Sequence, residues 1–137
     1  MRQGSISRLA PTPALWKRCA MFIAWTTLAT RIDAEKLAAD VVTRGLAVCA
    51  QVDGPITSHY LWRGRPERTE EYRLSLKCLP TKVTALEAHV LANHPYEVPE
   101  WVVIRAEQVG EKYLSWANAG PTTSSNPKPL IRLVKCS

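Results

Sequence analysis

Several patterns typical of catalysis and metal binding are missing from this sequence. The four cysteines (Cys19, Cys49, Cys78 and Cys136) stand singly, with no Cys-x-x-Cys pair and no Cys/His spacing of a zinc site. There is no glycine-rich phosphate loop, no Gly-x-Ser-x-Gly and no helix with paired histidines. These absences argue against an enzyme. Nothing demands disulfides, which favours a reducing, cytoplasmic compartment, and Cys49 is predicted to be a small buried hydrophobe.

Acidic residues are missing from the N-terminal part of the chain. The formal net charge is +6, but all twelve acidic residues lie between Asp33 and Glu111, and the segment 21–119 that contains them holds eleven of the eighteen basic residues. The segment 21–119 therefore carries a net charge of about −1, and the excess positive charge belongs to the two ends. A central domain without a basic face is not expected to bind nucleic acid.

Long apolar runs are lacking as well. The run Cys19–Ala29 has eleven residues, too few to span a membrane. Because Lys17-Arg18 precedes it, the run fits either a signal peptide or a first strand behind a leader. The elements that follow favour the strand, since two helices on one face of a sheet need a strand that feeds the first helix. Residues 1–18 are then a disordered leader, or a targeting leader if the destination is an organelle.

Two helices are predicted from apolar spacing and end signals. Asp33 is a good N-cap, and apolar residues recur at helical spacing until Gly45. The second helix follows Pro80-Thr81 and ends at His94, because Pro95 disfavours helix in the residue before it.

Strands are predicted around these helices. Alternation indicates strands at 46–52 and 59–62, a turn at 63–66 and a returning strand at 71–78. A short buried strand at 101–104 and a short helix at 110–119 follow. The order is βαββαβ plus a closing helix, in one domain over residues 19–119, with a flexible tail at 120–137.

Two segments are more particular than a generic sheet. The first is Ser-His-Tyr-Leu-Trp-Arg-Gly at 58–64, and the second is His-Pro-Tyr-Glu-Val-Pro-Glu at 94–100, followed by Tyr-Leu-Ser-Trp at 113–116. With Leu-Ala-Val-Cys-Ala at 46–50, they resemble the CutA divalent-cation-tolerance family over residues 22–119. The resemblance implies an α+β, ferredoxin-like protomer in a homotrimer, arranged like the PII signalling proteins. Its hairpin would add to a neighbour's sheet, which removes an exposed aromatic edge.

The candidate ligand or interface residues come from these segments and the strands beside them. They are Tyr60, Trp62, Glu71, Lys77, Tyr96, Glu100 and Trp116. Glu71 and Lys77 share a strand face but lie about 20 Å apart along it, so each is expected to find a partner elsewhere, plausibly in another protomer.

His94 is the candidate metal ligand, at a helix end whose dipole favours the protonated ring. The alternative is a histidine that only caps its helix through a backbone carbonyl. The resemblance associates copper with a first-strand cysteine and a His-His pair, but this chain has Thr26-Thr27 and Asn93-His94 there. Cu²⁺ or another divalent cation is therefore expected to bind weakly and to depend on His94, with Cys78 as a further thiol near the site.

The function predicted from the sequence is that of a homotrimeric divalent-cation-tolerance protein, with weak metal binding at clefts between protomers and no enzymatic activity. The alternative is a PII-like sensor of a small molecule that signals to a protein partner. No membrane span is expected.

Overall fold

A computed structural model describes residues 21–120 of the chain. The predicted leader (1–18) and tail beyond Gly120 lie outside the described residues. The elements, in chain order, are β1 (Phe22–Leu28), α2 (Arg31–Thr43), β2 (Cys49–Trp62), β3 (Arg65–Cys78), a 3₁₀ turn (Pro80–Lys82), α3 (Val83–Asn93), β4 (Val102–Arg105) and α4 (Glu111–Ala119).

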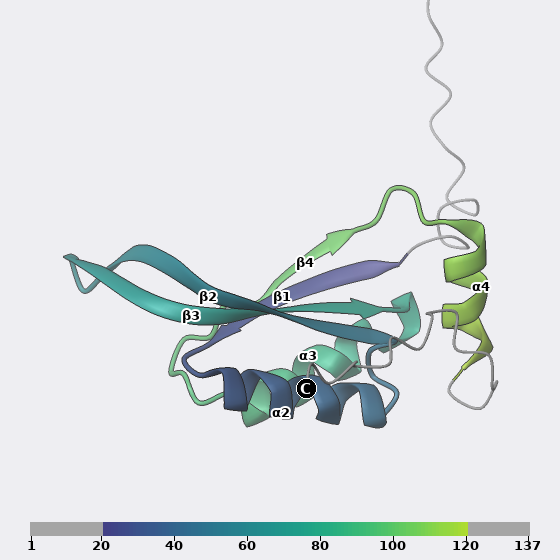
Figure 1. Ribbon diagram of the computed structural model, residues 1–137, viewed down its shortest axis with the longest axis horizontal. Helices are drawn as coiled ribbons and strands as arrows, with labels where there is room; N and C mark the ends of the chain where they lie inside the picture. Colours follow the sequence, from purple (N-terminus) through teal and green to yellow (C-terminus); the bar gives the residue numbers. More distant parts are fainter. Residues whose placement is uncertain (1–20, 121–137) are drawn as a thin grey trace, which may run out of the picture.

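The architecture is α+β, as predicted. Four antiparallel strands form one sheet in the order β2-β3-β1-β4, so β2 and β4 are the edges. Helices α2 and α3 cover one face of the sheet, and α4 lies at one end of it (Figure 1). The βαββαβ order confirms that the apolar run near the N-terminus supplies the first strand. No helix within residues 21–120 is long and apolar enough to cross a bilayer.

The first helix begins two residues earlier than predicted. Thr30 is the N-cap, and its Oγ1 accepts a hydrogen bond of 3.1 Å from the backbone N–H of Asp33. Asp33 therefore lies in the first turn, where a carboxylate also interacts favourably with the helix dipole. The predicted cap position was wrong because the threonine three residues upstream caps the helix instead.

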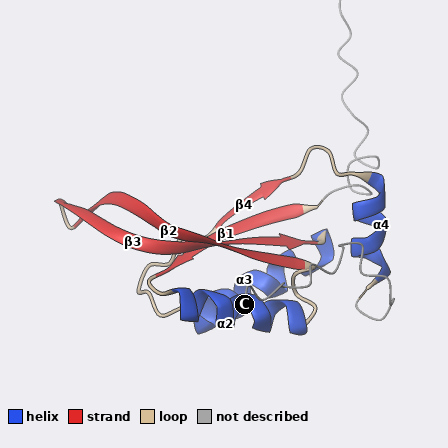
Figure 2. Cartoon of the chain, viewed as in Figure 1, coloured by secondary structure: helices blue, strands red, loops and turns tan. Residues whose placement is uncertain are grey.

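The hairpin is longer and more continuous than the sequence indicated. The predicted strands at 46–52 and 59–62 belong to the single strand β2, and β3 begins six residues before the predicted Glu71. Positive φ values at Arg63 (50°) and Gly64 (77°) make a two-residue turn, so Arg65 already pairs with Trp62. The distal half of this hairpin projects beyond the helices (Figure 2).

An irregularity separates the packed and projecting halves of the hairpin. The register shifts between Asp53 and Ile56, and Gly54 at the bulge has φ +152°. Arg31, at the start of α2, donates a 2.9 Å hydrogen bond to the Gly54 carbonyl oxygen. The same guanidinium lies over the Tyr72 ring, with 5.0 Å between its Cζ and the ring centroid. These contacts tie the bulge to the helical layer.

The core lies between the sheet and the two helices. The predicted alternation of the returning strand is confirmed, because Leu74 and Leu76 are fully buried while Arg73 is exposed. The other elements contribute further fully buried side chains to this core, those of Leu28, Val41, Leu86 and Val90. Cys78 belongs to this core, and burial raises the pKa of its thiol to about 11.

Two other burial predictions were wrong. Cys49 is only half-buried, since it lies on the outer face of β2 opposite Lys77 rather than among the core residues. The strand β4 was expected to be buried, but Val102 and Ile104 are exposed because β4 is an edge and its outer face carries no helix.

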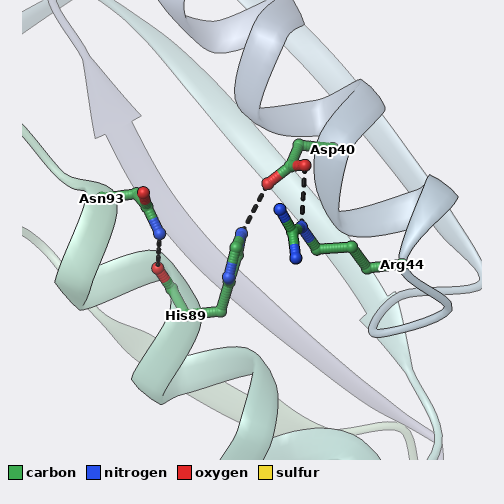
Figure 3. Close-up of polar contacts among 4 residues, drawn as sticks. All are labelled: Asp40, Arg44, His89 and Asn93. Carbon is green, nitrogen blue, oxygen red and sulfur yellow. Dashed lines mark hydrogen bonds and ion pairs between the residues drawn. The ribbon is translucent and has the colours of Figure 1, made fainter.

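The two sheet-covering helices are joined by a polar network (Figure 3). Asp40 of α2 bonds His89 Nε2 of α3 through one carboxylate oxygen and Arg44 Nε through the other, at 2.5 and 2.8 Å. Asn93 Nδ2 donates to the His89 carbonyl oxygen at 2.8 Å. Hydrogen bonds from Arg44 and then His89 lower the pKa of Asp40. This cluster fixes α3 against α2 and was not anticipated from the sequence.

Candidate functional site

A concavity lies on the outer face of the described chain, where the projecting hairpin leaves the sheet. Its volume is about 890 Å³. One wall is the hairpin itself, and the opposite wall is the segment 96–100 that connects α3 to β4. The polar and aromatic residues of these walls include Ser58, Tyr60, Trp62, Glu67, Glu70, Glu71, Tyr96, Glu97 and Glu100.

The structure brings five of the predicted ligand or interface residues together around this pocket. They are Tyr60, Trp62, Glu71, Tyr96 and Glu100. The strand register explains the hairpin contribution, because Tyr60 pairs with Glu67 and both project from the same face. Tyr60 and Trp62 are 44% and 40% exposed in the single chain, so their rings are available for contact.

Lys77 and Trp116 are not part of the pocket. Lys77 Nζ donates to Gln51 Oε1 at 2.9 Å and lies 5.8 Å from the centroid of the Tyr113 ring. Trp116 packs near Tyr113 on α4, with 5.5 Å between the ring centroids. These residues gather at the opposite end of β3 from the pocket, so one site cannot contain them all.

Glu71 finds two partners elsewhere in its own chain, as its separation from Lys77 along the strand requires, and neither partner comes from another protomer. Ser58 Oγ donates to one carboxylate oxygen at 2.5 Å, and the Tyr96 hydroxyl donates to the other at 3.0 Å. Burial, followed by the hydrogen bond and charge of Glu71, raises the pKa of Tyr96 well above its usual value. Tyr96 therefore stays protonated and serves as a fixed donor that joins the two walls.

His94 is fixed by both of its ring nitrogens. Nδ1 accepts a hydrogen bond from the Tyr96 backbone N–H at 3.1 Å, so it carries no proton. Nε2 then carries the proton and donates to the Thr27 carbonyl oxygen at 2.9 Å, beside Thr26 Oγ1 at 3.1 Å. The prediction that the helix dipole favours a cationic ring was wrong. Burial lowers the pKa of His94, against the opposing effects of the Thr27 carbonyl and the Glu71 charge.

The positions that the family resemblance linked to copper do meet, but their chemistry does not fit the metal. Thr26 contacts the His94 ring, yet a hydroxyl is a poor ligand for copper and neither imidazole nitrogen has a free lone pair. Asn93 turns away along α3 toward the His89 carbonyl. Cys78 pairs with Phe22, four residues along β1 from Thr26 or about 13 Å, so its thiol is not near His94 as expected.

Protonation of His94 should weaken the fold below neutral pH. The folded state holds the neutral ring and binds fewer protons than the unfolded chain, so stability is complete above the ordinary pKa near 6.5. It should fall as pH drops below that value. Urea denaturation between pH 5 and 8 should show this slope, and His94→Gln should flatten it. If the free energy of unfolding of the variant depends on pH as steeply as that of the unaltered protein, a group other than His94 causes the pH dependence.

Two of the five carboxylates in the pocket, those of Glu67 and Glu70, were not anticipated from the sequence. Glu67 lies four residues before Glu71 in β3, so both side chains project from the same face of the strand. This spacing could have predicted that Glu67 accompanies Glu71. Glu70 had no such signal. Its approach to the pocket depends on the twist of the hairpin, which does not follow from local spacing. The nearness of Glu97 to Tyr96 and Glu100 in the sequence did indicate a shared polar pocket.

Comparisons with known proteins agree with this architecture. The family model described as "CutA1 divalent ion tolerance protein" matches residues 22–120. The chain therefore belongs to the CutA1 divalent ion tolerance family.

Particular relatives show how much of the chain is shared. "Protein CutA homolog" of Xenopus laevis is 39% identical over 93 residues, covering 68% of this chain and 62% of that protein. "Protein CutA, chloroplastic" of Arabidopsis thaliana is 32% identical over 100 residues, 73% of this chain and 55% of that protein. The chain thus spans about three fifths of the first of these relatives and little more than half of the second. The structure of CutA from Synechococcus elongatus PCC7942 has a TM-score of 0.71 at 31% identity, covering 74% of this chain and 89% of that one.

Proposed function

We propose that the protein acts in divalent-cation tolerance as a non-enzymatic homotrimer that binds divalent cations weakly at clefts between protomers. The observation that carries this proposal is the outer-face pocket, where five glutamates line one cavity beside the edge strand β2. Carboxylate oxygens attract divalent cations, and a second protomer that pairs with β2 would enclose the open side of the cavity.

Assembly through the hairpin is supported by unpaired edge groups and by exposed apolar side chains. Strand β2 has fourteen residues and a neighbour on one side only. Trp62, Val98 and Val102 are exposed in the single chain, which is unusual unless a partner covers them. A closed ring of three copies would use the same surfaces in every protomer and leave no free edge. The compartment proposed is the cytoplasm, or an organelle if residues 1–18 act as a transit segment; the chloroplastic relative supports the second option.

Metal titration by calorimetry tests the proposed function. Cu²⁺, Zn²⁺ and Mg²⁺ should bind weakly, and His94→Ala should leave this binding unchanged because both ring nitrogens are already bonded. We therefore propose that the binding does not depend on His94. Tight Cu²⁺ binding that is lost in His94→Ala would show that His94 is a metal ligand and would contradict weak binding by the carboxylates of the pocket.

A PII-like sensor of a small molecule is the second candidate. The observation that favours it is the size of the pocket, which lies within the range of about 300–1,000 Å³ found for small-molecule sites.

A further inference from the structure

The outer-face pocket is much too large for a single ion. Its volume of about 890 Å³ compares with roughly 30 Å³ for a water molecule in the liquid. A cavity of this size suits a ligand with several functional groups, so the positions of its charges become informative.

The negative charges of the pocket are distributed around it. Glu67 and Glu70 come from β3, whereas Glu97 and Glu100 come from the segment before β4 on the opposite wall. Within residues 21–120, no three His, Cys, Asp or Glu side chains converge closely enough to hold a metal ion. Among the described residues that line the pocket there is no lysine or arginine. A ligand that matches this pattern carries several positive charges separated in space.

The aromatic wall adds a second kind of recognition. Tyr60 and Trp62 project from the same face of β2 into the pocket wall. The Trp62 ring already accepts a cation from outside the pocket lining, since Arg63 Cζ lies 5.7 Å from its centroid. Aromatic faces of this type attract organic cations, which lose less hydration than metal ions when they bind.

The geometry points to an elongated organic polyamine as the specific ligand of this pocket. Its ammonium groups would pair with the carboxylates of the two walls, while its methylene chain and one ammonium group would contact the ring of Tyr60. Glu71 would take little part in binding, because Ser58 and Tyr96 already occupy both of its oxygens. The inference rests on the proposed function because it uses the same pocket between protomers, but it names a different class of ligand from a metal ion.

Calorimetry with spermidine on the full chain in its native oligomeric state tests this inference. Spermidine is expected to bind once per protomer, and triethylene glycol, an uncharged chain of similar length, is expected to give no heat. Glu67→Gln and Glu100→Gln should each weaken binding about two- to fivefold, as for exposed charge pairs. Tyr60→Leu, which keeps an apolar side chain, should weaken it by a similar factor. Glu107→Gln, exposed and outside the pocket, is the matched control and should bind as the unaltered protein does.

Three results would overturn the inference. They are the absence of spermidine binding, binding that Glu67→Gln and Glu100→Gln leave unchanged, and tighter binding of Mg²⁺ than of spermidine in competition. The last result would leave the proposed divalent-cation function standing. Light scattering on the same samples tests the oligomer separately, so a monomer would refute the proposed assembly without deciding the ligand class.

Discussion

Replacing Gly54 with alanine is expected to lower the free energy of unfolding by about 2–5 kcal/mol, more than the same change at any other described glycine. A Cβ at this position would lie 2.5 Å from Tyr72 Cδ1 and 3.0 Å from the Glu71 carbonyl oxygen. The backbone φ of +152° is also one that side-chain-bearing residues rarely adopt. Because the second clash is with backbone, rotation of a side chain cannot relieve it.

The consequence of this substitution reaches the pocket. Glu71 is the residue whose backbone would be displaced, and its carboxylate holds Ser58 and Tyr96 in place. Gly54→Ala should therefore perturb ligand binding as well as stability. Urea denaturation measures the first effect, and calorimetry with spermidine measures the second.

Two glycines serve as controls for Gly54. Gly64 has a positive φ of 77°, but a methyl group added there would meet open space, so Gly64→Ala isolates backbone strain from crowding. Gly110 has neither feature, and Gly110→Ala should change stability by less than about 0.5 kcal/mol. If Gly54→Ala is as stable as Gly110→Ala, the backbone at the bulge moves enough to accept a methyl group, and the predicted clash is wrong.

Replacing Trp62 with alanine is expected to dissociate the proposed trimer. The indole is 40% exposed in the single chain and lies near the end of an edge strand, where a partner would bury it. Truncating a buried tryptophan costs about 3–5 kcal/mol, and the loss would be repeated at each interface of the ring. Light scattering at micromolar concentration should change from three times the chain mass of 15.3 kDa toward one chain mass.

Leu61 is the matched control for Trp62. It is its neighbour in the chain and is 72% exposed, but it projects from the opposite face of β2. Leu61→Ala should therefore leave the assembly intact. If both variants remain trimeric, or if the unaltered protein is a monomer, the hairpin face is not the interface.

The sequence by itself determined the elements and their order. Alternation at Tyr72, Leu74 and Leu76 defines the core face of β3, and Pro95 fixes the end of α3, because both depend on local backbone and side-chain geometry. The two family motifs, at 58–64 and 94–100, contain residues of both walls of the pocket. The start of α2 was not determined in this way, because Thr30 and Asp33 are both good capping residues and Thr30 caps the helix.

Only the tertiary structure decided which of the candidate residues meet. Strand register and the path of the segment after α3 bring Glu71 to Tyr96, 25 positions away, and leave Lys77 at the far end of the same strand. The same long-range packing places His94 against the end of β1, where both of its ring nitrogens form hydrogen bonds. Periodicity describes the face on which a residue lies, whereas contact between distant segments depends on how the whole chain closes around its core.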